Sequence, residues 1–298
     1  MHAFDYLVPS SVAEAIEVMA RHNGAARPLA GGTDLIDQMR VGRLTPALLV
    51  DVKKLRELNV LTSGADGLHV GAAVPCYRIY GYDIVNQQYS ALADSCHIIG
   101  GIQIQSRASV GGNLCNSGPA ADSTPAMIAL SGVCVIAGPG GTREVPVESF
   151  CTGPGKNVLQ PGELLVELRF SPQPAHSGSH YRRMIPRNEM DIAIVGVGAS
   201  VVLDERGQNF VSARIGLGAV APTPLFAQAA SELLAGKPVN DASLELAAAA
   251  AREIASPITD MRGTREYRIH VTGVLVKRVL QAAISRARGE EFTYCHGH

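Results

Sequence analysis

The sequence lacks long hydrophobic runs, an excess of charge of either sign and a secretion signal. No apolar stretch among its 298 residues reaches the roughly 18 residues of a membrane-spanning helix, so we expect no transmembrane segment. The formal net charge is −1, and no basic cluster is interleaved with aromatic residues, which argues against a nucleic-acid partner. The N-terminus has neither the basic nor the apolar region of a signal peptide, so we expect a cytoplasmic protein.

Paired metal-binding cysteines are also missing. The six cysteines are widely scattered, and none forms a C-x-x-C motif, so we expect no zinc or iron–sulfur site in this chain. No catalytic triad or paired-carboxylate motif is found either. We interpret the cysteines as free and mostly buried thiols; they are Cys76, Cys96, Cys115, Cys134, Cys151 and Cys295. Cys115 lies in a glycine-rich stretch where it could contact a ligand, although a small apolar filler is the commoner role.

The most informative stretch present is Ser109–Asp122, which reads SVGGNLCNSGPAAD. Its glycine pair permits positive φ and close approach of a ligand. Pro119 suits the first turn of a helix, and the apolar run 125–130 would give that helix a buried face. A loop whose N–H groups converge at a helix start binds phosphate well. A tight turn between buried elements explains the glycines alone equally well.

A second stretch, Pro28–Leu35, has the same composition: PLAGGTDL contains an apolar run, two glycines and a hydroxyl residue. The apolar residues that follow it predict a strand, a turn and a helix. Two such loops indicate a ligand with two phosphates, held from both sides. Neither loop is the G-x-G-x-x-G fingerprint of a Rossmann fold. Gly153–Lys156 resembles a nucleoside-triphosphate loop, but Asn157 follows it instead of Ser or Thr.

The hydrophobic pattern predicts an α+β chain of two domains, with a linker rich in Pro, Ser and Gly at 171–179. Before the linker, Ser11 and Glu14 form a candidate capping box for a helix at 11–22. We also expect helices at 76–85 and 90–96, strands at 26–30 and 48–52, and hairpins within 58–73 and 133–147. After it we expect antiparallel strands at 192–203 and 210–220, with helices at 225–234, 242–255 and 266–288 on one face of the sheet.

Four segments together resemble the FAD-binding medium subunit of molybdenum hydroxylases, a family that includes the carbon monoxide dehydrogenase medium subunit and the xanthine dehydrogenase FAD subunit. They are the two glycine stretches, Tyr181–Ala193 and Asp260–Arg268, in the family's order and spacing. The resemblance implies that residues 1–173 form an FAD-binding domain of the vanillyl-alcohol-oxidase/PCMH type, whose two α/β lobes clasp non-covalent FAD. It implies that residues 179–289 form a C-terminal flavoprotein domain of the carbon monoxide dehydrogenase type.

The resemblance assigns cofactor-binding roles but no catalytic residue to this chain. The expected FAD-binding residues are Pro28, Leu29, Ala30, Gly31, Gly32, Thr33, Asp34, Leu35, Ser109, Val110, Gly111, Gly112, Asn113, Asp122, Leu165, Arg182, Arg183 and Ile192. The hydroxyl groups at 33 and 109 can donate to phosphate oxygens. Asp122 would accept from a ribose hydroxyl or a polar cofactor edge, or would only stabilise a helix N-terminus. Leu165 would lie beside the flavin. Arg182 or Arg183 would lie near a phosphate, or both form a solvated surface pair.

Two positions depart from the family pattern. Many members have Thr at the position of Ser109 and Gly at that of Ala108. Serine keeps the hydroxyl, so only the rigidity of the loop is affected. Some relatives bind FAD covalently through His or Cys, and the nearest candidates for such a bond here are Cys115 and His97.

By resemblance, the chain is the FAD-carrying electron-transfer subunit of a molybdenum hydroxylase complex. A large partner subunit would hold the molybdenum cofactor, and a small partner subunit would relay single electrons from two [2Fe–2S] clusters. FAD would collect two electrons and pass them to an external acceptor. The resemblance also implies a hetero-oligomer, and the expected assembly is a dimer of heterotrimers.

Ile192 bears on the electron acceptor. Some relatives have tyrosine there, which covers the flavin face, whereas isoleucine would leave room for a nicotinamide, so we expect NAD to reach the flavin. Alternatively, Ile192 only begins a buried strand. Two other functions stay open: a stand-alone FAD-dependent oxidoreductase acting on a small alcohol or sugar, and a non-catalytic nucleotide-binding or assembly protein.

Overall fold

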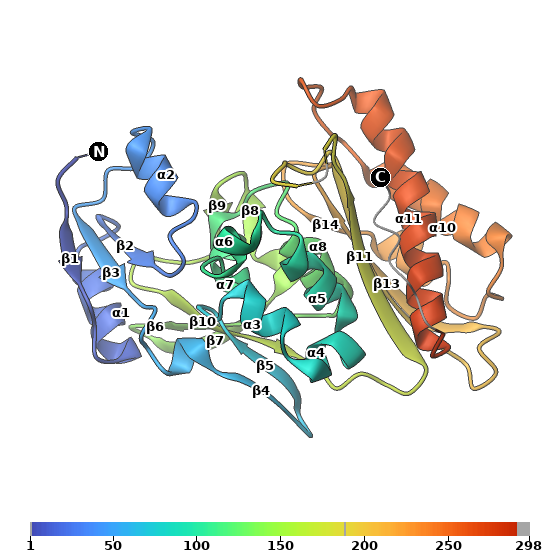
Figure 1. Ribbon diagram of the computed structural model, residues 1–298, viewed down its shortest axis with the longest axis horizontal. Helices are drawn as coiled ribbons and strands as arrows, with labels where there is room; N and C mark the ends of the chain where they lie inside the picture. The colour runs from blue at the N-terminus through green and yellow to red at the C-terminus, as the bar shows by residue number, and fades with distance from the viewer. Residues whose placement is uncertain (1, 188, 291–298) are drawn as a thin grey trace.

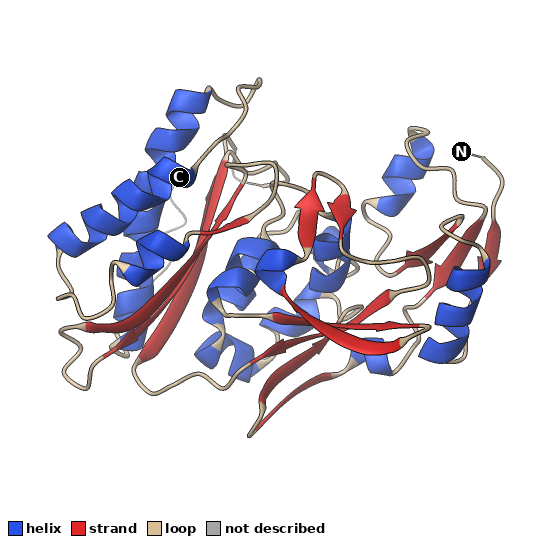
Figure 2. Cartoon of the chain, turned by 180° about the vertical axis from the view of Figure 1, so that it is seen from behind, coloured by secondary structure: helices blue, strands red, loops and turns tan. Residues whose placement is uncertain are grey.

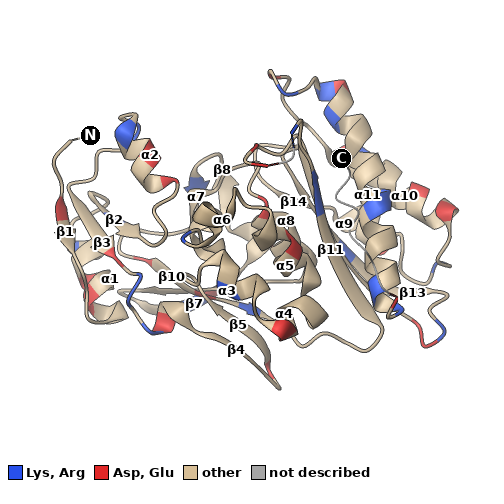
Figure 3. Cartoon of the chain, in the orientation of Figure 1, with Lys and Arg blue, Asp and Glu red and all other residues tan. Residues whose placement is uncertain are grey.

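The computed structural model describes residues 2–187 and 189–290 and arranges them in three successive parts along its longest axis (Figure 1). A small N-terminal lobe is followed by a larger middle lobe and then by a C-terminal domain. Basic and acidic positions are interspersed over all three parts (Figure 3). The last cysteine, Cys295, lies outside the described residues. The five described cysteines are free, as predicted, and three of them are buried.

The N-terminal lobe is a three-stranded parallel sheet with one helix on each face. Its strands are ordered β1 (Asp5–Leu7), β3 (Leu48–Asp51) and β2 (Ala26–Leu29), and its helices are α1 (Val12–Arg21) and α2 (Leu35–Arg40). Side chains alternate along β3, so Val50 packs with α1 and Leu49 packs with Met39 of α2. The predicted cap of α1 is confirmed, because Ser11 Oγ accepts from the Glu14 N–H.

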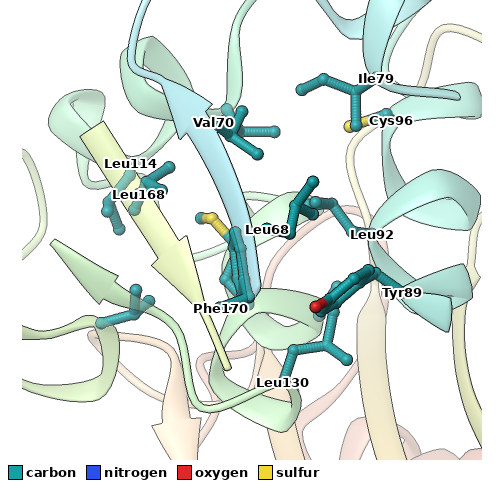
Figure 4. Packing of buried hydrophobic residues seen from close by; sticks show 14 of the residues in the cluster. Leu68, Val70, Ile79, Tyr89, Leu92, Cys96, Leu114, Leu130, Leu168 and Phe170 are labelled. Atoms are coloured by element: carbon teal, nitrogen blue, oxygen red, sulfur yellow. The ribbon is translucent and has the colours of Figure 1, made fainter. Parts of the chain in front are cut away.

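The middle lobe consists of an antiparallel sheet that is covered by short helices. The sheet order is β4 (Leu61–Gly64), β5 (Gly67–Gly71), β10 (Leu164–Phe170), β6 (Val133–Gly138) and β7 (Gly141–Pro146). The helices are α3 (Cys76–Tyr80), α4 (Asp83–Gln88), α5 (Ser90–His97), α6 (Ile102–Gln105), α7 (Val110–Asn116) and α8 (Ser123–Ala129). A hairpin of β8 (Cys151–Gly153) and β9 (Lys156–Asn157) and two 3-10 turns, Glu57–Asn59 and Val147–Ser149, complete it. Leu68, Leu92, Leu114 and Phe170 pack in its core (Figure 4).

The C-terminal domain is an antiparallel sheet between two layers of helices. Its strands are β11 (Ser177–Met184), β12 (Val195–Leu203), β13 (Phe210–Gly218) and β14 (Leu225–Phe226), and its helices are α9 (Gln228–Glu232), α10 (Asp241–Ile254) and α11 (Arg265–Ala287). Helix α11 packs on one face, and α5 and α8 of the middle lobe pack on the other (Figure 2). A Cβ on Gly216 would lie 2.3 Å from the Pro125 carbonyl oxygen, so the sheet contacts α8 through backbone.

The α+β architecture, with an FAD-type domain before an antiparallel sheet domain, agrees with the prediction, but several boundaries were wrong. The single helix predicted at 76–85 is interrupted at Gly81 and becomes α3 and α4. Strand β12 begins at Val195 and not at 192, and the helix predicted from 225 begins at 228 because β14 comes first.

The predicted linker at 171–179 is also partly wrong, because β11 begins inside it at Ser177. Ser177 pairs with Val202 of β12, and a Cβ on Gly178 would lie only 2.2 Å from the Ala283 carbonyl oxygen of α11. Small residues are therefore required there by the close approach of a helix, although in sequence they resemble a linker.

Candidate cofactor site

A cavity of about 750 Å³ lies between the N-terminal and middle lobes and extends to the first residues of the C-terminal domain. Both glycine stretches line it, although they are about 80 residues apart in sequence. The expected residues that line it are Pro28, Ala30, Gly31, Gly32, Thr33, Asp34, Leu35, Ser109, Gly111, Gly112, Asn113, Asp122, Leu165, Arg183 and Ile192. Its volume is in the upper part of the usual range for small-molecule sites.

Three expected residues lie outside the lining. Leu29 packs into the small core under α2, and Val110 is fully buried in the core of the middle lobe. Arg182 neighbours Arg183 on β11, where successive side chains point to opposite faces, so only Arg183 reaches the cavity.

The first turn, Gly31–Thr33, presents backbone donors to the cavity. Gly32 has φ of +79°, a left-handed conformation that favours glycine. Within the described residues, the N–H groups of Gly31, Gly32 and Thr33 donate to no protein acceptor. A Cβ on Gly31 would lie 2.1 Å from the Arg107 carbonyl oxygen, and Arg107 Nε donates to the Gly31 carbonyl at 3.1 Å. The first turn is therefore packed on the segment that leads into the second.

The second glycine pair lies inside a helix and not in the predicted loop. Helix α7 begins at Val110, and its N-cap Ser109 accepts from the Gly112 N–H at 3.1 Å. The predicted helix start at Pro119 is wrong, because α8 begins only at Ser123. The glycine pair is helical because the cap bond of Ser109 starts a helix there despite the low helix propensity of glycine. The first N–H groups of α7 still have no acceptor inside the helix, so the turn keeps its attraction for anions.

The two glycines of α7 have different surroundings. A Cβ on Gly111 would lie 2.5 Å from the Ala72 carbonyl oxygen, so protein packing requires that glycine. Gly112 is exposed to the cavity, and a Cβ there would meet only Ser109 Oγ, at 3.1 Å. Gly112 is therefore the glycine of α7 whose open side faces the ligand space.

Asp122, at the start of α8, binds protein groups through both of its carboxylate oxygens. Tyr181 Oη donates to Oδ1 at 2.8 Å, and Arg183 Nη1 donates to Oδ2 at 2.6 Å. Arg183 Nη2 also donates to the Ile98 carbonyl at 2.9 Å, so Asp122 and the residue after α5 both hold the guanidinium. Burial raises the pKa of Asp122 to about 6, although Arg183 and the Tyr181 hydroxyl oppose the shift. Asp122 thus positions Arg183 at the cavity wall.

Cys115 also lines the cavity. Burial, with a smaller effect of Cys151, raises the pKa of its thiol to about 12, so the thiolate needed for a covalent bond is scarce at neutral pH. His97, the other residue considered for covalent attachment, packs against the Tyr80 ring and is absent from the described lining.

The sequence analysis missed several lining segments. The most extensive is the connection 159–163 between β9 and β10, together with the flanking strand residues Asn157 and Leu164. Asn157 Nδ2 donates to the Cys115 carbonyl at 2.9 Å and so ties this segment to α7. Gln38 and Asn116 were missed as well. Asn116 lies within the stretch Ser109–Asp122, but no local pattern marked it or the other residues as lining, so the tertiary arrangement identifies them.

The described ranges 2–187 and 189–290 contain neither a membrane-spanning helix nor a cluster of metal ligands. No helix there is long and apolar enough to cross a bilayer. No group of three or more His, Cys, Asp or Glu side chains there is placed to hold a metal ion.

Comparison with known families defines the class of protein. Residues 2–173 match the family described as FAD binding domain in molybdopterin dehydrogenase. Residues 179–283 match the CO dehydrogenase flavoprotein C-terminal domain. The chain therefore belongs to the family of FAD-binding medium subunits of molybdenum hydroxylases, and it is an oxidoreductase flavoprotein subunit.

Individual relatives agree with this assignment over nearly the whole chain. A putative xanthine dehydrogenase FAD-binding subunit of Escherichia coli is 34% identical over 283 residues, which cover 94% of this chain and 96% of that one. The carbon monoxide dehydrogenase medium chain of Afipia carboxidovorans is 32% identical over 286 residues, covering 96% and 98%. Among solved structures, reconstituted CO dehydrogenase from Oligotropha carboxidovorans has a TM-score of 0.91 at 31% identity, covering 96% and 99%. Quinoline 2-oxidoreductase from Pseudomonas putida has a TM-score of 0.87 at 30% identity.

The cavity fits FAD on its own chemistry. A dinucleotide has two phosphates, and the walls offer unpaired N–H groups from the first turn and the N-terminus of α7. Apolar residues such as Leu58 and Leu165 line other parts and suit flat ring systems. The cavity thus suits a ligand that carries both phosphate groups and flat ring systems.

Proposed function

We propose that this chain takes electrons from iron–sulfur clusters of a partner subunit in a molybdenum hydroxylase complex and passes them to an external acceptor. The observation that supports this most directly is the single cavity into which both glycine turns and the segment Met190–Ile192 project. Bound FAD would supply the chemistry that combines single electrons into a two-electron transfer. The molybdenum cofactor and the [2Fe–2S] clusters would lie on partner subunits.

The residues of this chain bind and orient the cofactor in this proposal. The N–H groups of Gly31–Thr33 and of the first turn of α7 hold the pyrophosphate from two sides, and the Thr33 and Ser109 hydroxyls add donors. Arg183, fixed by Asp122, supplies positive charge at the wall nearest the C-terminal domain. Leu165, which is buried on β10, provides an apolar surface beside the ring system.

Attachment of FAD is non-covalent in this proposal, as the high pKa of the Cys115 thiol favours. Denaturing the purified protein and filtering it should release one FAD per chain. Colour that stays with the polypeptide would contradict this.

The partners are tested by purifying the protein from its native source and measuring which chains and metals accompany it. A stable, flavin-loaded and fully active monomer would contradict both the heterotrimer and its dimer.

The stand-alone oxidoreductase alternative is not favoured. The relatives are named as subunits or chains of larger dehydrogenases, and this chain covers nearly all of their length. The cytoplasmic location expected from the sequence stays a prediction.

NAD is the acceptor that we propose. Ile192 lines the mouth of the cavity and is 51% exposed, as is Met190, and it lies three residues before β12 begins. Hydride transfer needs reacting atoms within roughly 3–3.5 Å, so an open flavin face is required.

The test is stopped-flow reoxidation of the reduced complex, in which NAD should reoxidise the flavin. Ile192→Tyr should slow reoxidation by NAD more than tenfold while leaving the rate with a quinone or dye unchanged. Ile192→Val is the matched control. Failure of millimolar NAD where a quinone succeeds would contradict the proposal.

A further inference from the structure

A hydrogen bond between two amide side chains joins the N-terminal lobe to the middle lobe at the cavity. Gln38 Nε2, on α2, donates to Asn116 Oδ1, at the end of α7, over 2.9 Å and 78 residues of sequence. Both residues are half-buried, and both line the cavity. In the described chain, no other hydrogen bond joins a side chain of residues 2–56 to a side chain of the middle lobe. We call this contact the Gln38–Asn116 bridge.

The position of the bridge relative to the glycine turns is set by helix geometry. Gln38 follows Asp34 by four residues along α2, and Asn116 follows Gly112 by four residues along α7. Four residues are about one helical turn, or roughly 5.4 Å. Each amide therefore lies about one turn beyond the N–H groups that face the ligand space. The bridge therefore joins the two cavity walls on the side where both helices lead away from the turns.

The two ends of the bridge are held with different firmness. On α7, the Asn157 side chain donates to the Cys115 carbonyl at 2.9 Å, and the Gly155 N–H donates to the Ser117 carbonyl at 3.0 Å. On α2, Met39 is the one buried residue, packed with Leu29 and Leu49. The amide of Asn116 is thus fixed to the middle lobe, whereas Gln38 is carried by a short and lightly packed helix.

We propose that the Gln38–Asn116 bridge sets the rate at which the cofactor leaves the cavity. This inference rests on the proposed binding of FAD there. Both amides line the cavity about one helical turn from the turns that would hold a dinucleotide, so we expect the two lobes to separate at this contact when the cofactor leaves. Losing one hydrogen bond of ordinary net strength corresponds to about a 2- to 10-fold change in an equilibrium or a rate.

The test measures FAD release from the holoprotein after dilution, followed through the fluorescence of the freed flavin. Gln38→Ala and Asn116→Ala should each release FAD about 3- to 10-fold faster, and the double variant should be no faster than the faster single one. Asp37→Ala is the matched control, because Asp37 is an exposed neighbour on α2 outside the described lining, and its rate should be unchanged.

A reciprocal exchange separates the bridge from a general packing role. Asn and Gln carry the same amide and differ by one methylene. Gln38→Asn alone should release FAD faster because the amides no longer meet, and adding Asn116→Gln should return the rate to within twofold of the wild type. A packing role would not be rescued in this way. Hydrogen exchange of α2 amides in the flavin-free protein should show the same pattern of loss and rescue.

Two results would overturn the inference, and they are distinguishable. If the wild-type protein retains one FAD and both alanine variants release FAD at the wild-type rate, the role of the bridge is overturned and the proposed function stands. A wild-type protein that never holds FAD would overturn the proposed function and the bridge's role with it.

Discussion

The first glycine turn, Gly31–Thr33, and the second, Gly111–Asn113, line one cavity with nearly the same sequence, but their backbones adopt different conformations. In the first, Gly31 packs on the Arg107 backbone and Gly32 has a left-handed φ. In the second, both glycines lie within a helix, where Gly111 packs on the Ala72 backbone and Gly112 faces the cavity. One glycine of each pair thus joins parts of the protein, and the other shapes the space for the ligand.

The helices that follow the turns differ as well. Ser109 caps α7 with a side-chain hydrogen bond, and α7 buries Val110, Gly111 and Leu114 in the middle lobe. Asp34 precedes α2 without a cap bond, and α2 buries only Met39. The second turn therefore belongs to the stable core, whereas the first belongs to a lightly packed edge. Equal sequence patterns do not imply equal local stability.

The largest expected effect comes from the two glycines that pack directly on backbone atoms of another segment. Gly31→Ala and Gly111→Ala would place a Cβ 2.1 Å and 2.5 Å from backbone carbonyl oxygens, so the backbone must shift. We expect each to lower the free energy of unfolding by about 3 kcal/mol or more, which is the upper part of the range for overpacking. Thermal and denaturant unfolding measure it. Gly140→Ala is the control, since no atom lies within 4 Å of its added Cβ. Stability equal to that control would contradict the packing role.

The second prediction separates the ligand-facing glycine from the packing glycine. Gly112→Val should abolish flavin binding while far-UV circular dichroism and the melting temperature of the flavin-free protein stay close to wild type. The reason is obstruction of the cavity, because Gly112 is helical and an L residue is allowed there. A strained φ at this position, which the sequence had suggested, is not found. Full flavin occupancy in the variant would show that this turn does not hold the cofactor.

Local patterns predicted the parts of the site that depend on neighbours in sequence. Glycine pairs beside apolar runs placed both turns, and Ser11 and Glu14 placed the first helix. The start of α7 was missed because two glycines argue against a helix, and a single cap at Ser109 outweighs them. The sequence could not tell which of Arg182 and Arg183 lines the cavity, because that choice depends on which face of β11 is turned toward α8. The contact between Gln38 and Asn116 has no local signal, although Asn116 lies in the second glycine stretch, since only folding brings the two residues together.

The third prediction concerns the acids near the two turns. Desolvation and the nearby Asp37 raise the pKa of Asp34, and burial raises the pKa of Asp122 although Arg183 opposes that shift. With a folded pKa of about 6 and an unfolded pKa of about 3.9, the native state keeps a proton that the unfolded state loses between those values. Stability should therefore fall as pH rises from about 4 to 6, by about 3 kcal/mol from this group. Below that window both states are protonated, and the contribution no longer changes.

Comparing Asp122→Asn with the wild type isolates this contribution from the other titrating groups. The difference in unfolding free energy between the two proteins should depend on pH across the window of about 4 to 6 and level off on both sides of it. Urea unfolding of the flavin-free protein at several pH values gives the curve. A difference that is constant from pH 4 to 7 would show that the Asp122 pKa is ordinary.

The smallest effect tests the contrast between the two helix starts directly. Ser109→Ala removes a cap bond of 3.1 Å to the Gly112 N–H and should cost about 1 kcal/mol of unfolding free energy. Asp34→Ala removes a residue without a cap bond, whose carboxylate is already disfavoured by desolvation and by Asp37, so it should cost less than about 0.5 kcal/mol. Both are measured on flavin-free protein, so lost cofactor contacts do not contribute. Ser109→Thr keeps the hydroxyl and should stay near wild type. If Asp34→Ala costs as much as Ser109→Ala, the first turn is as firmly built as the second, and the distinction between a core turn and an edge turn is wrong.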